Sequence, residues 1–226
     1  WASIGHSQGG HAVLGAAQYE SRAQLNYKGT VAIAPASNLA SILTIGEQQA
    51  STLPINYQIQ MLAQLDTYTA LIVAGMQGHN KSVTYNEVFK NDTVILAPIA
   101  EAECSSTVGV QLGTAMSIYA AGIGQGTLTG YGRLQSGFMS IPVIDTFLKK
   151  DSQPGLAPLN KKVFIYQGEA DTTVPKAATD LLIASMKANG TSASNIQYTT
   201  SAAWDHGTVY TQNYTSFVDN IDSLFQ

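Results

Sequence analysis

The chain begins Trp1-Ala2-Ser3-Ile4-Gly5-His6-Ser7-Gln8-Gly9-Gly10. This stretch is the strongest indication of the fold, because Gly5 to Gly9 form a G-x-S-x-G pattern. A short apolar run precedes the pattern. Apolar residues with helical spacing follow it, at Ala12, Val13, Ala16, Ala17 and Tyr19. A strand, a sharp turn and a helix in this order are the setting of a nucleophile elbow. We expect a strained backbone at Ser7, with Gly5 and Gly9 removing side chains that would clash there.

Such an elbow predicts two chemical features. The hydroxyl of Ser7 is expected to be exposed above the sheet. The N–H of Gln8, at the start of the helix, is expected to point to where an oxyanion forms. The alternative is a chance match to a short pattern in a chain with 20 glycines. The structural context of the pattern and the partners of the serine decide between the two.

The composition limits the classes of protein to consider. A chain of 226 residues predicts one large domain, or one domain with an insertion. The net charge of −4 gives no basic footprint for nucleic acid. Charged residues make up 12% of the chain, so its surface is expected to rely on uncharged polar residues and glycine.

Several features favour a secreted protein. N-x-[S/T] triplets occur at Asn80, Asn91, Asn189 and Asn213, and each is a candidate N-glycosylation site. Cys104 is the one cysteine, and an odd cysteine in a secreted chain suggests a free thiol or a missing partner. Because the first residues resemble a core strand, we expect no signal peptide within this sequence.

The two ends of the chain share an alternating pattern of strands and helices. Apolar runs bounded by glycine or proline predict strands at 1–5, 30–34, 163–166 and 196–200. Amphipathic spacing predicts helices at 8–25, 177–188 and 214–225. Strand, helix and strand in this spacing predict βαβ units, and therefore a parallel sheet with right-handed crossovers.

The segment between them, residues 37–142, is expected to be helical. A wide apolar face predicts a helix at 58–76, and a short helix is expected at 141–149. Only 93–96 has a doubtful strand-like composition. Residues 104–132 contain no charged side chain, but Gly, Ser, Thr and Gln interrupt the run. Buried helices or an apolar pocket are therefore favoured over a membrane span.

Three strand ends carry residues suited to nucleophilic catalysis. Ser7 follows the first strand, Asp171 follows the strand at 163–166, and His206 follows the last strand. Loops at the carboxyl ends of parallel strands meet at one edge of a sheet. A serine needs a base within hydrogen-bond reach, which His206 would supply, and Asp171 would orient its imidazole. The order Ser, Asp, His is that of α/β-hydrolases.

Rival residues are less well placed for these roles. Asp180 falls in the middle of a predicted helix, and Asp205 adjoins the histidine that it would have to face. His6 and His11 belong to the elbow and its helix, and His79 is expected in a polar loop of the insertion. A histidine base must be neutral to accept a proton, so activity is expected to fall in acid.

Together these motifs resemble the secretory lipases of fungi, the lipase A type. The resemblance rests on Ile4-Gly-His-Ser7-Gln-Gly-Gly-His11, on Gly168-Glu-Ala-Asp171-Thr-Thr-Val-Pro175 and on Asp205-His206. It implies an α/β-hydrolase core, the carboxyl-terminal portion of the parallel sheet, at residues 1–36 and 143–226. It also implies a helical cap or lid at 37–142, hydrolysis of acylglycerols and similar esters, and contact of the cap with a lipid interface. No cofactor and no metal are implied.

The sequence also departs from that family. The strands that precede the elbow in the family, and the loop with the second oxyanion donor, have no counterpart here. In the family a cap cysteine pairs with an upstream one, which would leave Cys104 without its partner. Two other hypotheses therefore remain beside an active esterase. One is an impaired hydrolase that pairs with a missing amino-terminal segment, and the other is a peptidase or acyltransferase on the same fold.

Overall fold

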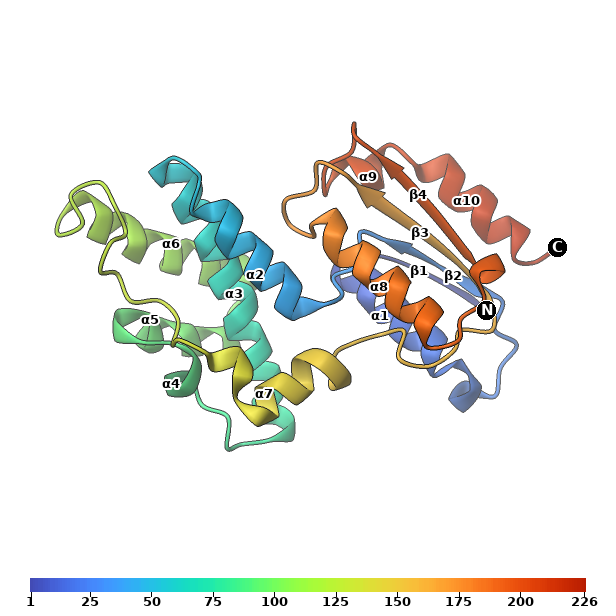
Figure 1. The fold of residues 1–226 in the computed structure, drawn as a ribbon, viewed down its shortest axis with the longest axis horizontal. Coiled ribbons are helices and arrows are strands. Elements are labelled where there is room, and N and C mark those ends of the chain that lie inside the picture. Colours follow the sequence, from blue (N-terminus) through green and yellow to red (C-terminus); the bar gives the residue numbers. More distant parts are fainter. The chain divides into compact units, whose positions relative to one another are not determined.

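A computed structural model describes residues 1–226 of the chain, apart from the side chain of His79. The loop expected at His79 is not present, because the main chain of His79 is the last residue of a helix, Ile55–His79. The chain divides into two compact units (Figure 1). Unit 1 comprises Trp1–Ile42 and Leu148–Gln226, and unit 2 comprises Leu43–Phe147.

Unit 1 is built on a four-stranded sheet in the order β1-β2-β3-β4. All three neighbouring pairs are parallel, with Ile4 opposite Val31 and Val31 opposite Phe164. The strands are β1 (Ala2–His6), β2 (Gly29–Ile33), β3 (Lys162–Gly168) and β4 (Ile196–Ser201). The predicted strands and their parallel pairing are confirmed. Their carboxyl ends share one edge of the sheet.

Helices cover both faces of this sheet (Figure 1). Successive residues of a strand point to opposite faces. Ala32 and Ile165 pack with α1 (Gln8–Gln18) and α8 (Lys176–Ala188) on one face. Val31 and Phe164 pack on the other face with α9 (Thr208–Thr211) and α10 (Tyr214–Ser223). The central strands β2 and β3 are therefore apolar on both sides, as in other α/β folds.

The helices predicted at 177–188 and 214–225 correspond to α8 and α10, whereas α9 was not predicted from the sequence. The helix expected at 8–25 ends at Gln18, and a 3₁₀ turn, Glu20–Ala23, follows Tyr19. A second 3₁₀ turn, Ala193–Asn195, precedes β4.

Unit 2 is helical, and α2 (Leu39–Ala50) leads into it. The other helices are α3 (Ile55–His79), α4 (Tyr85–Val88), α5 (Asn91–Leu96), α6 (Ser105–Ala121) and α7 (Pro142–Thr146). Shorter turns are Ala97–Glu101, Phe138–Ser140 and a π-helical turn at Phe147–Asp151. The strand-like stretch 93–96 is helical, within α5, because Thr93 is buried on the inner face of that helix.

Close packing of α3 on α6 forms the centre of unit 2. A Cβ atom at Gly113 would lie 3.4 Å from the Cβ of Ala63, and one at Gly109 would lie 3.3 Å from the Oγ1 of Thr67. Small residues thus allow the two helices to approach. Among the described residues, no helix combines the length and the apolar composition that a membrane crossing would require.

Unit 2 also contains a partly buried ion cluster. Arg133 donates to both carboxylate oxygens of Asp66, at 2.9 and 2.6 Å, and to both of Glu47, at 3.0 and 2.7 Å. The Asp66 side chain is fully buried. Burial raises the pKa of Asp66 to about 6, although the adjacent Arg133 charge acts in the opposite direction.

Candidate active site

The turn after β1 holds Ser7 in an unusual backbone conformation. Its φ is 58° and its ψ is −119°, a region that residues other than glycine rarely adopt. Three main-chain hydrogen bonds maintain the turn. The Ser7 N–H donates to the carbonyl of Ile33 at 2.8 Å, and the Ser7 carbonyl accepts from the N–H groups of His11 and Ala36. The strain expected at a nucleophile elbow is present.

The glycines around Ser7 differ in what they contribute. A Cβ atom at Gly5 would collide with the main-chain carbonyl of Gly9, so Gly5 allows the strand and the helix to approach. The expectation for Gly9 itself is wrong, because a Cβ atom there would meet open space. The second tight position is Gly10, where a Cβ atom would lie 2.8 Å from the carbonyl oxygen of Ile33.

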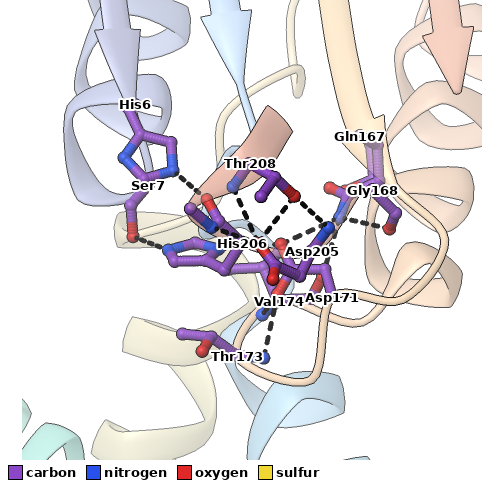
Figure 2. A network of polar contacts seen from close by, with 12 residues as sticks. His6, Ser7, Gln167, Gly168, Asp171, Thr173, Val174, Asp205, His206 and Thr208 are labelled. Atoms are coloured by element: carbon purple, nitrogen blue, oxygen red, sulfur yellow. Dashed lines mark hydrogen bonds and ion pairs between the residues drawn. The ribbon is translucent and has the colours of Figure 1, made fainter. Parts of the chain in front are cut away.

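The imidazole of His206 lies between Ser7 and Asp171 (Figure 2). Its Nε2 is 2.9 Å from the Oγ of Ser7, and its Nδ1 is 2.7 Å from the Oδ2 of Asp171. A carboxylate can only accept, so Nδ1 carries a proton and donates to Asp171. The neutral ring then has its Nε2 lone pair free to accept from the Ser7 hydroxyl. The structure brings together the three side chains singled out from the sequence.

Asp171 is held in the loop after β3 with its side chain fully buried. Its Oδ1 accepts hydrogen bonds from the N–H groups of Thr173 at 2.9 Å and Val174 at 2.8 Å. Its Oδ2 accepts from His206 and also from the Nε2 of Gln167 at 3.2 Å. These donors fix the carboxylate, and they compensate for its removal from water.

Gln167 is a supporting residue that sequence reasoning missed. Its side chain is fully buried, and its Nε2 also donates to the carbonyl of Val174 at 2.9 Å. Its Oε1 accepts from the hydroxyl of Thr179 in α8 at 2.7 Å. The signal was present in the sequence, since Gln167 is a long polar residue at the end of an otherwise apolar strand. It links the acid loop to the helix behind it.

His206 lies in a compact turn between β4 and α9. The Oδ1 of Asp205 accepts from the N–H groups of Gly207 at 2.9 Å and Thr208 at 2.7 Å, and from the Thr208 hydroxyl. These bonds, first of all the one from the Thr208 N–H, lower the pKa of Asp205. Asp205 therefore fixes the start of α9. The other rival acid, Asp180, pairs with Lys176 at 2.9 Å on the surface of α8.

His6, immediately before the nucleophile, is a second residue that the sequence did not assign. Its Nε2 donates to the main-chain carbonyl of His206 at 2.8 Å. Burial lowers the pKa of His6, and the proximity of His206 lowers it further. Figure 2 shows the His6 ring next to the segment that carries His206.

Gln8 is the first residue of α1 and directly follows Ser7. The first N–H groups of a helix have no acceptor within that helix, so the Gln8 N–H belongs to the class of groups that can donate to an oxyanion. Among the residues whose side chains are described, no group of three His, Cys, Asp or Glu side chains could hold a metal ion.

The predicted glycosylation sites differ in their surroundings. Asn213 is 8% exposed, and its Nδ2 donates to the carbonyl of Val209 at 2.9 Å, which disfavours modification of the folded chain. Asn189 is exposed, but its Nδ2 donates to Gly155 and Ser185. Asn80 uses its Oδ1 to accept from Ser82. Asn91 is exposed at the start of α5.

Cys104 lies directly before α6. Its thiol is free and exposed.

Comparison with known proteins identifies structures that have a similar fold. No protein-family model matches the sequence, and no curated protein matches it significantly. Among solved structures, a hydrolase-like protein of Legionella pneumophila superposes on 99% of this chain with a TM-score of 0.67 and 13% identity. The rice cell-wall-degrading esterase LipA of Xanthomonas oryzae superposes on 99% with a TM-score of 0.66 and 14% identity. A ligand-bound form of the same esterase superposes with a TM-score of 0.61.

These likenesses show that the chain has the α/β-hydrolase type of fold. The chain spans 56% of the length of the Legionella protein and 58% of that of the Xanthomonas esterase. The fold class expected from the sequence is therefore confirmed. At this level of identity the likeness concerns the fold alone.

Proposed function

We propose that the chain is a serine carboxylic-ester hydrolase that works through an acyl-enzyme. The observation that carries this proposal is the continuous hydrogen-bonded series from Ser7 through His206 to Asp171. Each member follows the carboxyl end of a different strand, where α/β sheets hold their sites. The strained backbone at Ser7 supports the same role, because strain of this kind accompanies function.

In the first half-reaction the Oγ of Ser7 attacks the carbonyl carbon of the ester while the Nε2 of His206 takes its proton. Asp171 keeps the proton on Nδ1 and stabilises the imidazolium that forms. The N–H of Gln8 donates to the oxyanion of the tetrahedral intermediate. When the intermediate collapses, the carbon–oxygen bond to the alcohol breaks and Nε2 returns the proton to the departing alcohol.

In the second half-reaction water attacks the acyl-Ser7 carbonyl carbon, and the Nε2 of His206 accepts a proton from that water. The collapse of the second intermediate releases the carboxylic acid and restores the Ser7 hydroxyl with the same proton. No atom changes its oxidation state in either half-reaction.

The finer part of the proposal concerns the substrate and the compartment. The resemblance to fungal lipases of the A type favours acylglycerols and related lipid esters, hydrolysed by a secreted and glycosylated protein. Unit 2 has an open groove of about 610 Å³ along α3 and α6, which is suited to an apolar group. Apolar side chains of Ile59, Val110 and Ile118 contribute to its lining. Contact of this unit with a lipid surface is part of the same proposal.

The test is hydrolysis of a series of esters that differ in acyl length, from acetate to long-chain glycerides. Wild-type protein should release acid and alcohol, and Ser7→Ala should release neither above the rate in buffer. A rise of kcat/KM with acyl length supports lipid esters, whereas a preference for acetate supports a short-chain esterase. Hydrolysis by Ser7→Ala at the wild-type rate would refute the proposal.

A second arrangement is favoured by the edge of the sheet at β1. Ile4, in the middle of this edge strand, is 48% exposed. An apolar edge strand offers unpaired main-chain groups to another strand. We propose as the alternative that β1 pairs with a further segment, which also supplies the second oxyanion donor. In that case the chain tested by itself folds but hydrolyses esters slowly, and addition of that segment restores the rate.

A further inference from the structure

The imidazole of His6 takes no part in the steps above, although it adjoins the nucleophile. His6 is the last residue of β1. Its Nε2 lies 2.8 Å from the main-chain carbonyl oxygen of His206. A carbonyl oxygen only accepts hydrogen bonds, so His6 carries its proton on Nε2. The residue before the nucleophile is thus bonded to the main chain of the candidate base.

Two aromatic contacts fix the orientation of the same ring. The ring centroids of His6 and His206 are 4.6 Å apart, with an angle of 40° between the ring planes. The His6 ring also stacks on Tyr210 of α9, with centroids 5.3 Å apart and planes at 24°. The ring therefore lies between the loop that carries His206 and the helix that follows it.

We propose that His6 is a positioning residue, which holds the main chain of His206 so that its imidazole reaches Ser7. This role rests on the esterase function proposed above and deepens it. Hydrogen bonds from the main chain of Gly207 and Thr208 to Asp205 hold the His206 loop on one side. The hydrogen bond from His6 to the His206 carbonyl holds it on the side of Ser7. Displacement of a catalytic group by about 1 Å can cost on the order of 10²-fold in rate.

The charge of His6 affects proton transfer from Ser7 to His206. Three groups that titrate or could hydrogen-bond surround the ring: His206, Asp171 and Tyr210. Burial and the neighbouring His206 charge lower the pKa of His6, and they outweigh the hydrogen bond to the His206 carbonyl and the Asp171 charge, which both raise it. A neutral His6 adds no repulsion when His206 becomes an imidazolium 4.6 Å away. A protonated His6 would oppose that charge, so acid should slow acylation through both rings.

The experiment measures the rate of phosphonylation by a fluorophosphonate, together with imidazole NMR spectra, on the full chain and three variants. His6→Phe keeps an aromatic ring but removes the donor. His6→Gln places an amide Nε2 at the same distance along the side chain. Tyr210→Leu removes the stacking partner and keeps the hydrogen bond. Circular dichroism and thermal unfolding verify that each variant is folded.

We expect His6→Phe to react roughly 10- to 100-fold more slowly than wild type. His6→Gln should recover most of this rate, and its rate should fall less steeply in acid than that of wild type because one titrating ring is gone. Tyr210→Leu should change the rate much less than His6→Phe. Equal rates for wild type and His6→Phe, or an equal loss in Tyr210→Leu, would contradict the positioning role.

The NMR spectra separate this role from the esterase proposal itself. If folded wild-type protein does not react, the esterase proposal fails, and the spectra still decide about His6. We expect the proton of His6 on Nε2 and a clear shift of the His206 ring signals in His6→Phe. A proton on Nδ1 of His6, or unchanged His206 signals, would overturn the role of His6 whatever the reactivity of Ser7.

Discussion

At the scale of single residues, the surroundings of each carboxylate separate Asp171 from its rivals. Asp171 is buried, and its oxygens face His206 and three donors from its own loop and strand. Asp205 uses its carboxylate to begin α9, and Asp180 is paired with Lys176 on the surface. Of the three carboxylates, Asp171 is the one that accepts a hydrogen bond from the imidazole of His206.

The first prediction follows from that difference. Asp171→Asn keeps the size of the side chain but removes the charge and favours the wrong tautomer of His206. We expect a rate loss on the order of 10⁴ in ester hydrolysis. Asp180→Asn is the matched control, because it makes the same chemical change on an exposed helix. Equal rates in the two variants would show that Asp171 does not act on His206.

The elbow glycines give a second prediction, on stability. A Cβ atom at Gly5 collides with the main chain of Gly9, so Gly5→Ala should lower the free energy of unfolding by roughly 1–3 kcal/mol. Gly9→Ala adds the same methyl group into open space within α1, where alanine should stabilise by up to about 1 kcal/mol. Denaturant unfolding of both variants is the measurement. A larger loss from Gly9→Ala would contradict the geometry of the elbow.

At the scale of secondary-structure elements, β1 lies at an edge of the four-stranded sheet. Ile4 presents an apolar side chain on this strand. We expect Ile4→Lys to reduce self-association at high concentration, because a charged residue on an edge strand discourages pairing with another chain. Light scattering of wild type and variant at matched concentrations measures the effect. Self-association that is unchanged or increased in the variant would show that β1 is not the strand through which two chains pair.

The ion cluster that links α2 and α3 to the segment carrying Arg133 gives a prediction on pH. Burial raises the pKa of Asp66 to about 6 in the folded protein, above its ordinary value of 3.8. A raised pKa means that the folded state binds a proton more readily than the unfolded state does. The stabilisation from this group is therefore complete below about pH 4 and is lost as the pH rises through 6.

The check compares thermal unfolding of wild type and Asp66→Asn from pH 4 to pH 7. Stability of the wild type relative to the variant should decline over this range. Glu47→Gln is the control, since the Glu47 side chain is 38% exposed and should show a weaker dependence on pH. A relative stability of the wild type that rises from pH 4 to pH 7 would mean that the Arg133 charge outweighs burial at Asp66.

At the scale of the whole molecule, local sequence pattern predicted the arrangement of unit 1 well. Most buried positions of β2 and β3 are apolar, with Thr30 and Gln167 as polar exceptions, and such runs predict buried parallel strands directly. Once those strands are parallel, topology brings Ser7, Asp171 and His206 to one edge of the sheet. The three residues could therefore be chosen from the sequence by position and chemical type.

Other features depend on contacts that no local pattern encodes. The roles of His6 and Gln167 come from hydrogen bonds to segments distant in the sequence, namely the His206 main chain and α8. Gly9 matches the sequence pattern, yet the close approach occurs at Gly10, because the constraint is the position of Ile33 on β2. Asn213 matches a glycosylation triplet, but only the fold reveals that it is buried.

Activation of Ser7 by His206 and Asp171 can be measured by covalent labelling of the serine. Wild-type protein and Ser7→Ala are exposed to a fluorophosphonate and analysed by intact-mass and peptide mass spectrometry. Phosphonylation needs an activated serine but no substrate of a particular acyl length. The proposed function predicts a single adduct on Ser7 that is absent from Ser7→Ala. A folded wild-type chain without an adduct, or with the adduct on another serine, would contradict it.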